Sequence, residues 1–244
     1  MNFKLSSAVC TGRRHLEAGL PCQDRVFLCR KEGRVCAALA DGAGSRENSH
    51  LGAACVTRCT AELLCRDFDR LWGLETWTLG RELTEHCLRE LARLEPPIDE
   101  MASTLLFFAA GEDGRYLAGH LGDGLQVLVP ETGEPRVFSA PENGEYLNET
   151  VFLTSTDAAE HLRLYRGTLT APGALLLMSD GVEGSLLQRS TGVPAPACRI
   201  LAQWLGREDE ETMDQILEEN LRQVFAAHTG DDLSLIVAAW SEGI

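Results

Sequence analysis

The alternation of apolar and polar residues along the chain predicts short strands and amphipathic helices. Apolar runs bounded by turn residues predict the strands, which we place at 3–10, 26–29, 35–40, 103–110, 116–121, 126–129, 162–169, 173–179 and 233–240. The run at 173–179 is almost continuously apolar. Such a run is typical of a central strand that is buried on both faces.

Apolar residues at helical spacing predict two pairs of helices, at 45–68, 74–94, 196–205 and 211–227. Ser45 suits the N-cap of the first helix, and Pro96 ends the second. Each helix carries one apolar stripe. We therefore expect each helix to cover a face of a sheet.

Two stretches follow neither pattern. Residues 11–25 are predicted to be turn-like, and residues 130–160 are rich in proline, glycine and polar residues. Within the second stretch, residues 141–157 are interpreted as a flap rather than as part of the core. The sequence contains no repeat, low-complexity tract or linker, so we predict one domain over residues 1–244.

Aspartates recur at the ends of the predicted strands. Three follow an apolar strand and precede a glycine, two open a strand, and in chain order they are Asp24, Asp41, Asp123, Asp180 and Asp231. A single Asp-Gly pair is most often only a hairpin turn, and Asp113 is assigned to such a turn without a functional role. The recurrence of this context at distant points of the chain is harder to explain by turn chemistry.

If the strands pair so that these ends meet, the carboxylates converge on one edge. Asp24 opens one strand of a predicted hairpin and Asp41 closes the other, so these two residues should be neighbours. Clustered carboxylates raise each other's pKa unless a cation neutralises them. An all-oxygen set suits Mg²⁺ or Mn²⁺. Two such ions about 4 Å apart can activate water for in-line attack on phosphorus.

The composition restricts the partners and the location. The formal net charge is −15, which argues against nucleic acid as a partner because phosphates require Lys and Arg. No apolar run approaches the roughly 20 residues that span a bilayer, and the first residues lack the apolar segment of a signal peptide. We therefore expect no membrane association and a cytoplasmic protein.

Nine cysteines are present, an odd number, and none forms a Cys-x-x-Cys motif. The spacing does not favour a zinc site, and the absence of a secretion signal does not favour a disulfide framework. Cys36, Cys55 and Cys87 lie within apolar runs and are interpreted as small buried hydrophobic residues.

The order of the polar motifs carries a resemblance to a known family. The motifs are Gln23-Asp24, Ala40-Asp41-Gly42-Ala43-Gly44, Ser103-Thr104, Gly122-Asp123-Gly124, Ser179-Asp180-Gly181 and Asp231-Asp232-Leu233-Ser234. Together they resemble the type 2C metal-dependent protein serine/threonine phosphatases, and residues 144–150 are similar to a bacterial branch of that class. Each motif alone is weakly specific, whereas the ordered set covers residues 10 to 240.

This resemblance implies an α+β fold, a four-layer αββα sandwich in which two mostly antiparallel sheets are flanked by helix pairs. It implies hydrolysis of phosphoserine and phosphothreonine by a water or hydroxide held by two Mn²⁺ or Mg²⁺ ions. The implied partner is a phosphorylated protein, the product of a Ser/Thr kinase. We expect the enzyme to be a monomer.

The resemblance also implies roles for the aspartates. The catalytic set would be Asp24, Asp41 and Asp180, with Asp24 orienting the metal-held water. Asp41 would bridge the two ions, with the carbonyl of Gly42 on one of them. Asp180 and Asp231 would complete the second ion's shell, and Asp123, with Asp180, would hold a weaker third ion.

The sequence departs from the family's pattern where phosphate is gripped. The class often has a glutamate where this chain has Gln23, and many members have an arginine where this chain has Gly19. Arg13, Arg14 or His15 could bind the substrate phosphate instead. Arg13 and Arg14 could equally be a solvated surface pair.

A non-enzymatic alternative is a catalytically weak or inactive phosphatase-like module that binds a phosphoprotein partner. Loss of one metal-binding aspartate would favour that alternative. Each of the expected aspartates is present, so the sequence favours an enzyme.

Overall fold

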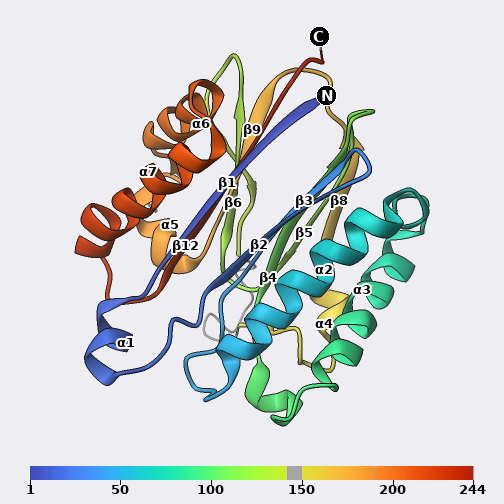
Figure 1. The fold of residues 1–244 in the computed structure, drawn as a ribbon, viewed down its shortest axis with the longest axis vertical. Coiled ribbons are helices and arrows are strands. Elements are labelled where there is room, and N and C mark those ends of the chain that lie inside the picture. The colour runs from blue at the N-terminus through green and yellow to red at the C-terminus, as the bar shows by residue number, and fades with distance from the viewer. Residues whose placement is uncertain (142–149, 189, 244) are drawn as a thin grey trace.

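The computed structural model describes residues 1–141, 150–188 and 190–243, and most of its strands form two antiparallel sheets of five strands each (Figure 1). Sheet 1 has the order β1 (Asn2–Cys10), β12 (Leu233–Ser241), β9 (Gly173–Met178), β6 (Leu125–Pro130) and β7 (Arg136–Ser139). Sheet 2 has the order β2 (Arg25–Lys31), β3 (Arg34–Ala40), β4 (Leu105–Gly111), β5 (Arg115–Leu121) and β8 (Arg163–Thr168). A short ribbon pairs β10 (Leu187–Gln188) with β11 (Val193–Pro194).

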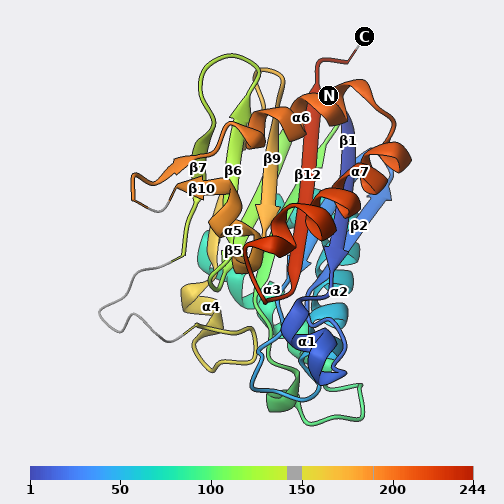
Figure 2. The same ribbon diagram turned by 90° about the vertical axis from the view of Figure 1, so that its left-hand side faces the viewer.

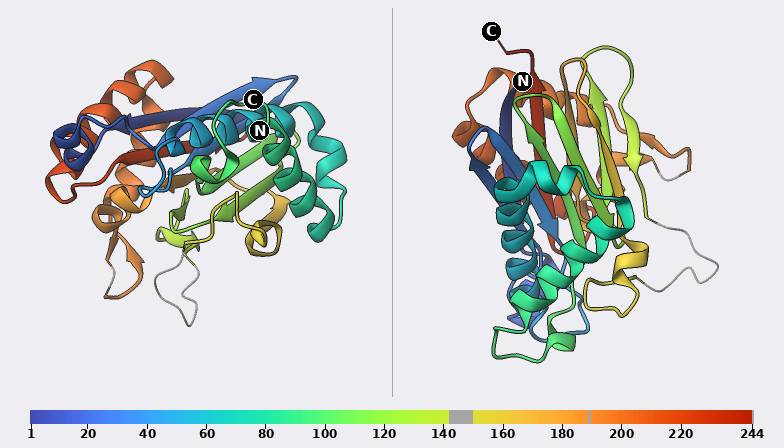
Figure 3. Two further views of the ribbon diagram at one scale, coloured as in Figure 1. Left: turned by 90° about the horizontal axis from the view of Figure 1, so that it is seen from below. Right: turned by 90° about the vertical axis from the view of Figure 1, so that its right-hand side faces the viewer.

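The two sheets stack face to face, and long helices cover their outer faces. Helices α6 (Ala197–Arg207) and α7 (Glu210–Gln223) lie on sheet 1 (Figure 2). Helices α2 (Ser49–Trp72) and α3 (Thr76–Leu91) lie on sheet 2 (Figure 3). This arrangement gives the predicted α+β fold and fits the expected four layers. Shorter elements are α1 (Arg13–Ala18), α4 (Ala158–His161), α5 (Asp180–Leu186) and the 3₁₀ turns Ile98–Met101 and Phe225–Ala227.

Three hydrophobic cores hold these layers together, and strand alternation divides residues among them. In β4, Phe107 packs toward α2 and α3, whereas Phe108 packs between the sheets. In β9, Leu176 packs toward α6 and α7, whereas Leu177 packs between the sheets. The predicted burial of this central strand on both faces is therefore confirmed.

The first long helix begins later than the sequence predicts. Gly42 still forms a bridge with Ser103, and the Ala43 amide donates to the Ala102 carbonyl, so this stretch continues the sheet edge. The helix begins at Ser49 with Asn48 at the N-cap. The prediction of Ser45 as the N-cap was wrong because backbone pairing past the strand end delays the helix.

Of the short elements that were not predicted, three lack a clear hydrophobic pattern. Helix α1 occupies part of the stretch predicted to be turn-like, and none of its six residues is buried. Strand β7 lies within the stretch predicted to be irregular and has four residues. Helix α5 begins directly at Asp180 and includes two glycines, Gly181 and Gly184, which weaken a helical signature.

Of the flap predicted at 141–157, residues 142–149 lie outside the described residues. The single domain over residues 1–244 also stays a prediction. Among the described residues, none of the helices combines the length and apolar character that crossing a bilayer requires. The cysteines are free thiols; Cys36 and Cys87 are buried, as predicted, and Cys55 is partly exposed.

Candidate active site

The strand registers bring the five predicted aspartates to the same end of the sandwich. In sheet 2, Arg25 pairs with Ala40, so the preceding Asp24 and the following Asp41 are neighbours, as the hairpin predicted. In sheet 1, Met178 of β9 pairs with Leu235 of β12 and with Leu125 of β6. The end of β9, which leads to Asp180, therefore lies beside the starts of the strands that follow Asp123 and Asp231. This end carries α1 and is opposite the chain termini (Figure 1).

Asp24 and Asp41 form the buried centre of this group. Asp24 is completely buried, and burial raises the pKa of its carboxyl to about 7. Burial, followed by the charges of Asp24 and Asp180, raises the pKa of Asp41 well above its usual range. Without a cation, these neighbouring carboxyl groups therefore retain protons that isolated aspartates would lose.

Asp180 connects this pair to the two remaining carboxylates. Burial, followed by the charges of Asp123 and Asp231, raises the pKa of Asp180 to about 6. Asp180 and Asp41 also interact directly. The interactions therefore run from sheet 2 across to sheet 1, so the site depends on how the two sheets stack.

The backbone around Asp41 is fixed by the start of β4. The Asp41 amide donates to Thr104 Oγ1 at 2.9 Å, and the Thr104 amide donates to the Asp41 carbonyl at 2.8 Å. The next amide, of Gly42, donates to the Gln23 carbonyl at 3.2 Å. These bonds bind the loop that carries Asp41 to the residue before Asp24.

Glycine is required directly after β5, at the residue that precedes Asp123. Gly122 has φ = +106°, a backbone conformation that side chains rarely allow. A Cβ at Gly122 would lie 2.4 Å from Thr104 Cγ2. The Asp123 loop therefore packs against the same threonine that holds Asp41.

Asp232 is a structural centre that the sequence analysis did not assign. Its carboxylate is 2% exposed and accepts three hydrogen bonds. Oδ1 accepts from the Gly12 amide at 2.6 Å, while Oδ2 accepts from the Gln23 amide at 2.5 Å and from His15 Nδ1 at 2.8 Å. A Cβ at Gly12 would lie 2.2 Å from the carbonyl carbon of Asp231. Asp232 thus attaches the loop between β1 and β2 to the strand that follows Asp231.

The three predicted phosphate-binding residues lie on α1 in different surroundings. Arg13 is exposed and faces Glu17 at 4.0 Å. Arg14 Nη1 lies 3.9 Å from Asp231 Oδ2, and its side chain lies against Gly230. His15 uses Nδ1 to pair with Asp232. Arg14 is thus the arginine of the two that lies beside the carboxylate group.

The carboxylates have the chemistry to bind a hard cation. Within the described ranges, no three Cys, His, Asp or Glu side chains are already gathered closely enough to enclose an ion. Both Asp24 oxygens and Asp123 Oδ1 are nevertheless buried without a hydrogen-bond partner among the described residues. The Ser234 and Ser179 hydroxyls lie near Asp24 and favour its charged form, but not in hydrogen-bonding geometry. Buried carboxylate oxygens without partners are costly unless a cation compensates them, so these residues fit one.

Comparisons with known proteins agree with this architecture. The chain is 26% identical over 257 residues to serine/threonine-protein phosphatase 3 of Escherichia coli (strain K12), covering 99% of this chain and all of that protein. The S. agalactiae serine/threonine phosphatase has a TM-score of 0.66 and 16% identity, over 97% of this chain and 99% of that one. RsbX in complex with magnesium has a TM-score of 0.61 and 14% identity, over 98% and 96% of the two chains.

The family described as "Protein phosphatase 2C" matches residues 11–222. This range includes Asp24, Asp41, Asp123 and Asp180 and ends before Asp231. The match spans most of the sequence and confirms the resemblance on which the fold prediction was based. The chain belongs to the protein phosphatase 2C family.

Proposed function

We propose that this chain is a metal-dependent phosphatase that hydrolyses phosphoserine and phosphothreonine in proteins. The observation that carries the proposal is the convergence of carboxylates from both sheets, with buried oxygens of Asp24 and Asp123 that lack hydrogen-bond partners among the described residues. Family membership and the name of the E. coli relative support the same reaction class.

The residues that would hold two divalent ions are Asp41, the Gly42 carbonyl, Asp180 and Asp231, with Asp123 at a weaker third position. When bound, Mn²⁺ or Mg²⁺ would supply positive charge that lowers the pKa of water and stabilises charge on the phosphoryl group. The magnesium complex of RsbX supports a hard divalent cation of this kind. The identity and number of the ions belong to the proposal.

The protein's own groups would orient the attacking water and the substrate. Asp24, buried beside Asp41, would accept a hydrogen bond from the water and hold its proton. Thr104 and Gln23 keep the loop that carries Asp41 in register with Asp24. Arg14, which lies beside Asp231, would bind the phosphate of the phosphoprotein.

The substrate would be a protein phosphorylated by a Ser/Thr kinase. The net charge of −15 argues against nucleic acid as a partner. The cytoplasmic location, the absence of membrane association and the monomeric state stay predictions.

Hydrolysis of a phosphothreonine peptide by metal-stripped protein tests this proposal. Phosphate release should require added Mn²⁺ or Mg²⁺ and stop in excess EDTA, and a matched phosphotyrosine peptide should react more slowly. Full turnover in EDTA would contradict the metal-dependent reaction. Tight binding of the phosphopeptide without turnover at any metal concentration would instead support a phosphoprotein-binding module.

A further inference from the structure

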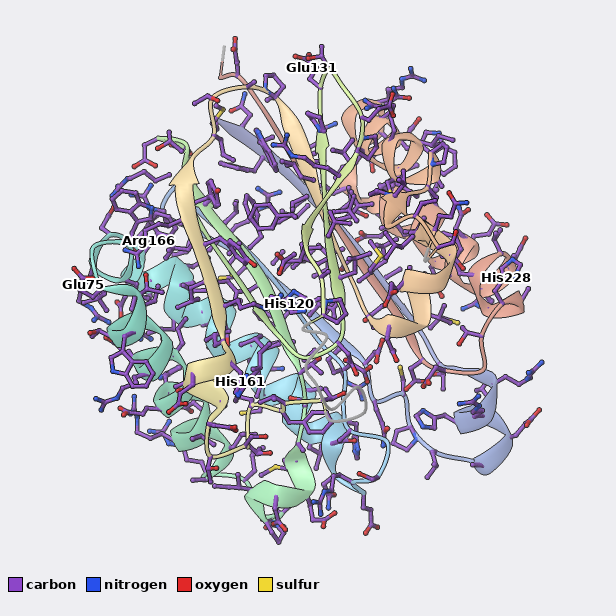
Figure 4. The ribbon with its side chains drawn as sticks, turned by 180° about the vertical axis from the view of Figure 1, so that it is seen from behind. Glu75, His120, Glu131, His161, Arg166 and His228 are labelled. Carbon is purple, nitrogen blue, oxygen red and sulfur yellow. The ribbon has the colours of Figure 1, made fainter. Side chains whose placement is uncertain are left out.

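His120 is a buried histidine that the reaction proposed above does not use. It lies near the end of β5, three residues before Asp123, and its side chain is completely buried. Figure 4 shows it near the middle of the molecule, whereas the labelled His228, which is exposed, lies at the edge of the view. A fully buried histidine requires partners for both ring nitrogens.

His120 belongs to a hydrogen-bond network that joins three different segments. Nε2 lies 3.1 Å from the Gly122 carbonyl oxygen, and Nδ1 lies 2.7 Å from Ser139 Oγ. Ser139 Oγ in turn lies 3.0 Å from the hydroxyl of Tyr165. The network thus joins β5 to β7 of the other sheet and to β8.

The chemistry of these partners fixes the tautomer of the ring. A carbonyl oxygen only accepts hydrogen bonds, so Nε2 must carry a hydrogen and donate it to Gly122. Burial, followed by the charge of Arg163, lowers the pKa of His120 to about 3, so the ring is neutral. In the neutral ring Nδ1 carries no hydrogen and accepts from the Ser139 hydroxyl. The ring is therefore held from both sides in one orientation.

The bond to Gly122 acts on the segment that carries Asp123. Gly122 has a φ of +106°, which glycine adopts readily, and packs against Thr104, which also accepts the hydrogen bond of the Asp41 amide. The Gly122 carbonyl belongs to the peptide unit that leads directly into Asp123. His120 holds this carbonyl, and Thr104 packs against the Cα of Gly122. The peptide between Gly122 and Asp123 is therefore restricted to one orientation.

Only one of the two carboxylate oxygens of Asp123 has a hydrogen-bond partner among the described residues. Its Oδ2 accepts from Thr150 Oγ1 at 2.7 Å, while Oδ1 is buried and has no hydrogen-bond partner within the described part of the chain. Oδ1 is therefore the atom available to a ligand, and its position follows from the orientation of the Gly122 peptide.

We propose that His120 is a positioning residue for the phosphatase reaction: it donates a hydrogen bond to the Gly122 carbonyl and thereby holds Asp123 Oδ1 in place for a divalent cation. This inference rests on the proposed function. It assigns to His120 no contact with substrate or ion. Residues that orient metal ligands in this way typically change metal affinity by about 10- to 100-fold when they are replaced.

A matched pair of amide substitutions separates this role from simple packing. The side-chain nitrogen of glutamine can occupy the place of Nε2, whereas that of asparagine reaches only the place of Nδ1. His120→Gln should therefore keep the bond to Gly122, and His120→Asn should lose it. Tyr165→Phe removes the far end of the network and serves as the control.

Binding of Mn²⁺ is measured by the electron paramagnetic resonance signal of the free ion, alongside thermal unfolding and hydrolysis of an aryl phosphate. We expect His120→Asn to weaken the weakest Mn²⁺ site by about 10-fold or more. We expect His120→Gln and Tyr165→Phe to stay close to wild type. The tighter sites should change little in all three variants.

Equal Mn²⁺ binding by the asparagine and glutamine variants would overturn the inference. A loss of Mn²⁺ affinity in all three variants that is proportional to their loss of melting temperature would also overturn it. Hydrolysis by the wild type in the same series tests the proposed function separately. A failure of the proposed function can therefore be distinguished from a failure of the role inferred for His120. Histidine ¹⁵N spectra of the wild type provide a check that needs no variant. A hydrogen on Nδ1 instead of Nε2 would also overturn the inference.

Discussion

Asp232 Oδ2 lies 2.8 Å from His15 Nδ1. Asp232 directly precedes β12, so this pair attaches the loop between β1 and β2 to the start of β12. The same carboxylate accepts the amides of Gly12 and Gln23. Because Gln23 precedes Asp24 and Asp232 follows Asp231, this one side chain connects two of the proposed catalytic and metal-binding positions.

Asp232→Asn should destabilise the protein because the amide offers a hydrogen where the carboxylate accepts one. A buried donor left without an acceptor costs about 1–3 kcal/mol, and we expect the free energy of unfolding in urea to fall by about that amount. Asp99→Asn, a change at an exposed position, is the control. Equal stability of both variants would show that the buried acceptor contributes nothing.

The strand ends and their aspartates were predictable from the sequence because two local signals coincide. Alternating or continuous apolar runs define the strands, and an aspartate at the end of such a run has no packing role. The register of the hairpin then placed Asp24 beside Asp41 without further information. Asp113, assigned to a plain turn, indeed accepts hydrogen bonds only from its neighbour Arg115 among the bonds of the described residues.

The roles of Asp232 and His120 could not be predicted from the sequence, because each role depends on hydrogen-bond partners that are distant along the chain. Asp232 directly follows Asp231, and the two have the same local sequence. Only the fold shows that Asp232 is the one that is buried and accepts three hydrogen bonds. His120 interrupts an apolar strand, and its partner Ser139 lies on β7, which has no strand signature of its own. Helix α1 was missed because it buries nothing and so leaves no periodic pattern.

Asp41→Asn and Asp180→Asn should each lower phosphatase activity by about 100-fold or more, because each removes a charge from the proposed metal-binding group. The stability of the metal-free variants should hold or rise, since the change relieves repulsion among buried carboxylates. Steady-state kinetics with saturating Mn²⁺ and urea unfolding in EDTA measure both effects.

Asp113→Asn is the matched control for these two variants. Asp113 occupies a similar Asp-Gly sequence but lies on the turn between β4 and β5, at the other end of β5 from Asp123. Its substitution should leave activity within about twofold of wild type, as expected for a surface change away from the site. Loss of activity as large as that of Asp41→Asn would contradict the assignment by position in the fold.

Arg14→Ala should raise KM for a phosphopeptide more than it lowers kcat, because a phosphate-binding cation contacts ground state and transition state alike. The Arg14 guanidinium lies 3.9 Å from Asp231, whereas Arg13 lies beside Glu17 on the exposed face of α1. Arg13→Ala should therefore change neither constant. An unchanged KM in both variants would mean that phosphate is bound without help from α1.

The contribution of Asp24 and Asp180 to the stability of the metal-free protein should fall as pH rises from about 4 to about 7. Burial raises the pKa of Asp24 to about 7 and that of Asp180 to about 6, so the folded state binds protons that the unfolded state releases. Such groups contribute stability that is complete below their unfolded pKa and is lost as pH passes the folded pKa. The change per group is at most about 1.4 kcal/mol for each pH unit.

His120 acts in the opposite direction, because its pKa falls on folding and protonation of the unfolded state costs stability below about pH 6.5. The contribution of Asp24 is therefore isolated as the difference between wild type and Asp24→Asn, measured by urea unfolding in EDTA at several pH values. The wild type should lose stability relative to the variant as pH rises through 7. Added Mg²⁺ should reverse this trend, because a cation binds the deprotonated carboxylates and its binding strengthens as pH rises. A difference that does not change with pH in EDTA would mean that the folded protein leaves Asp24 ionised, and the carboxylate repulsion inferred for the site would then be wrong.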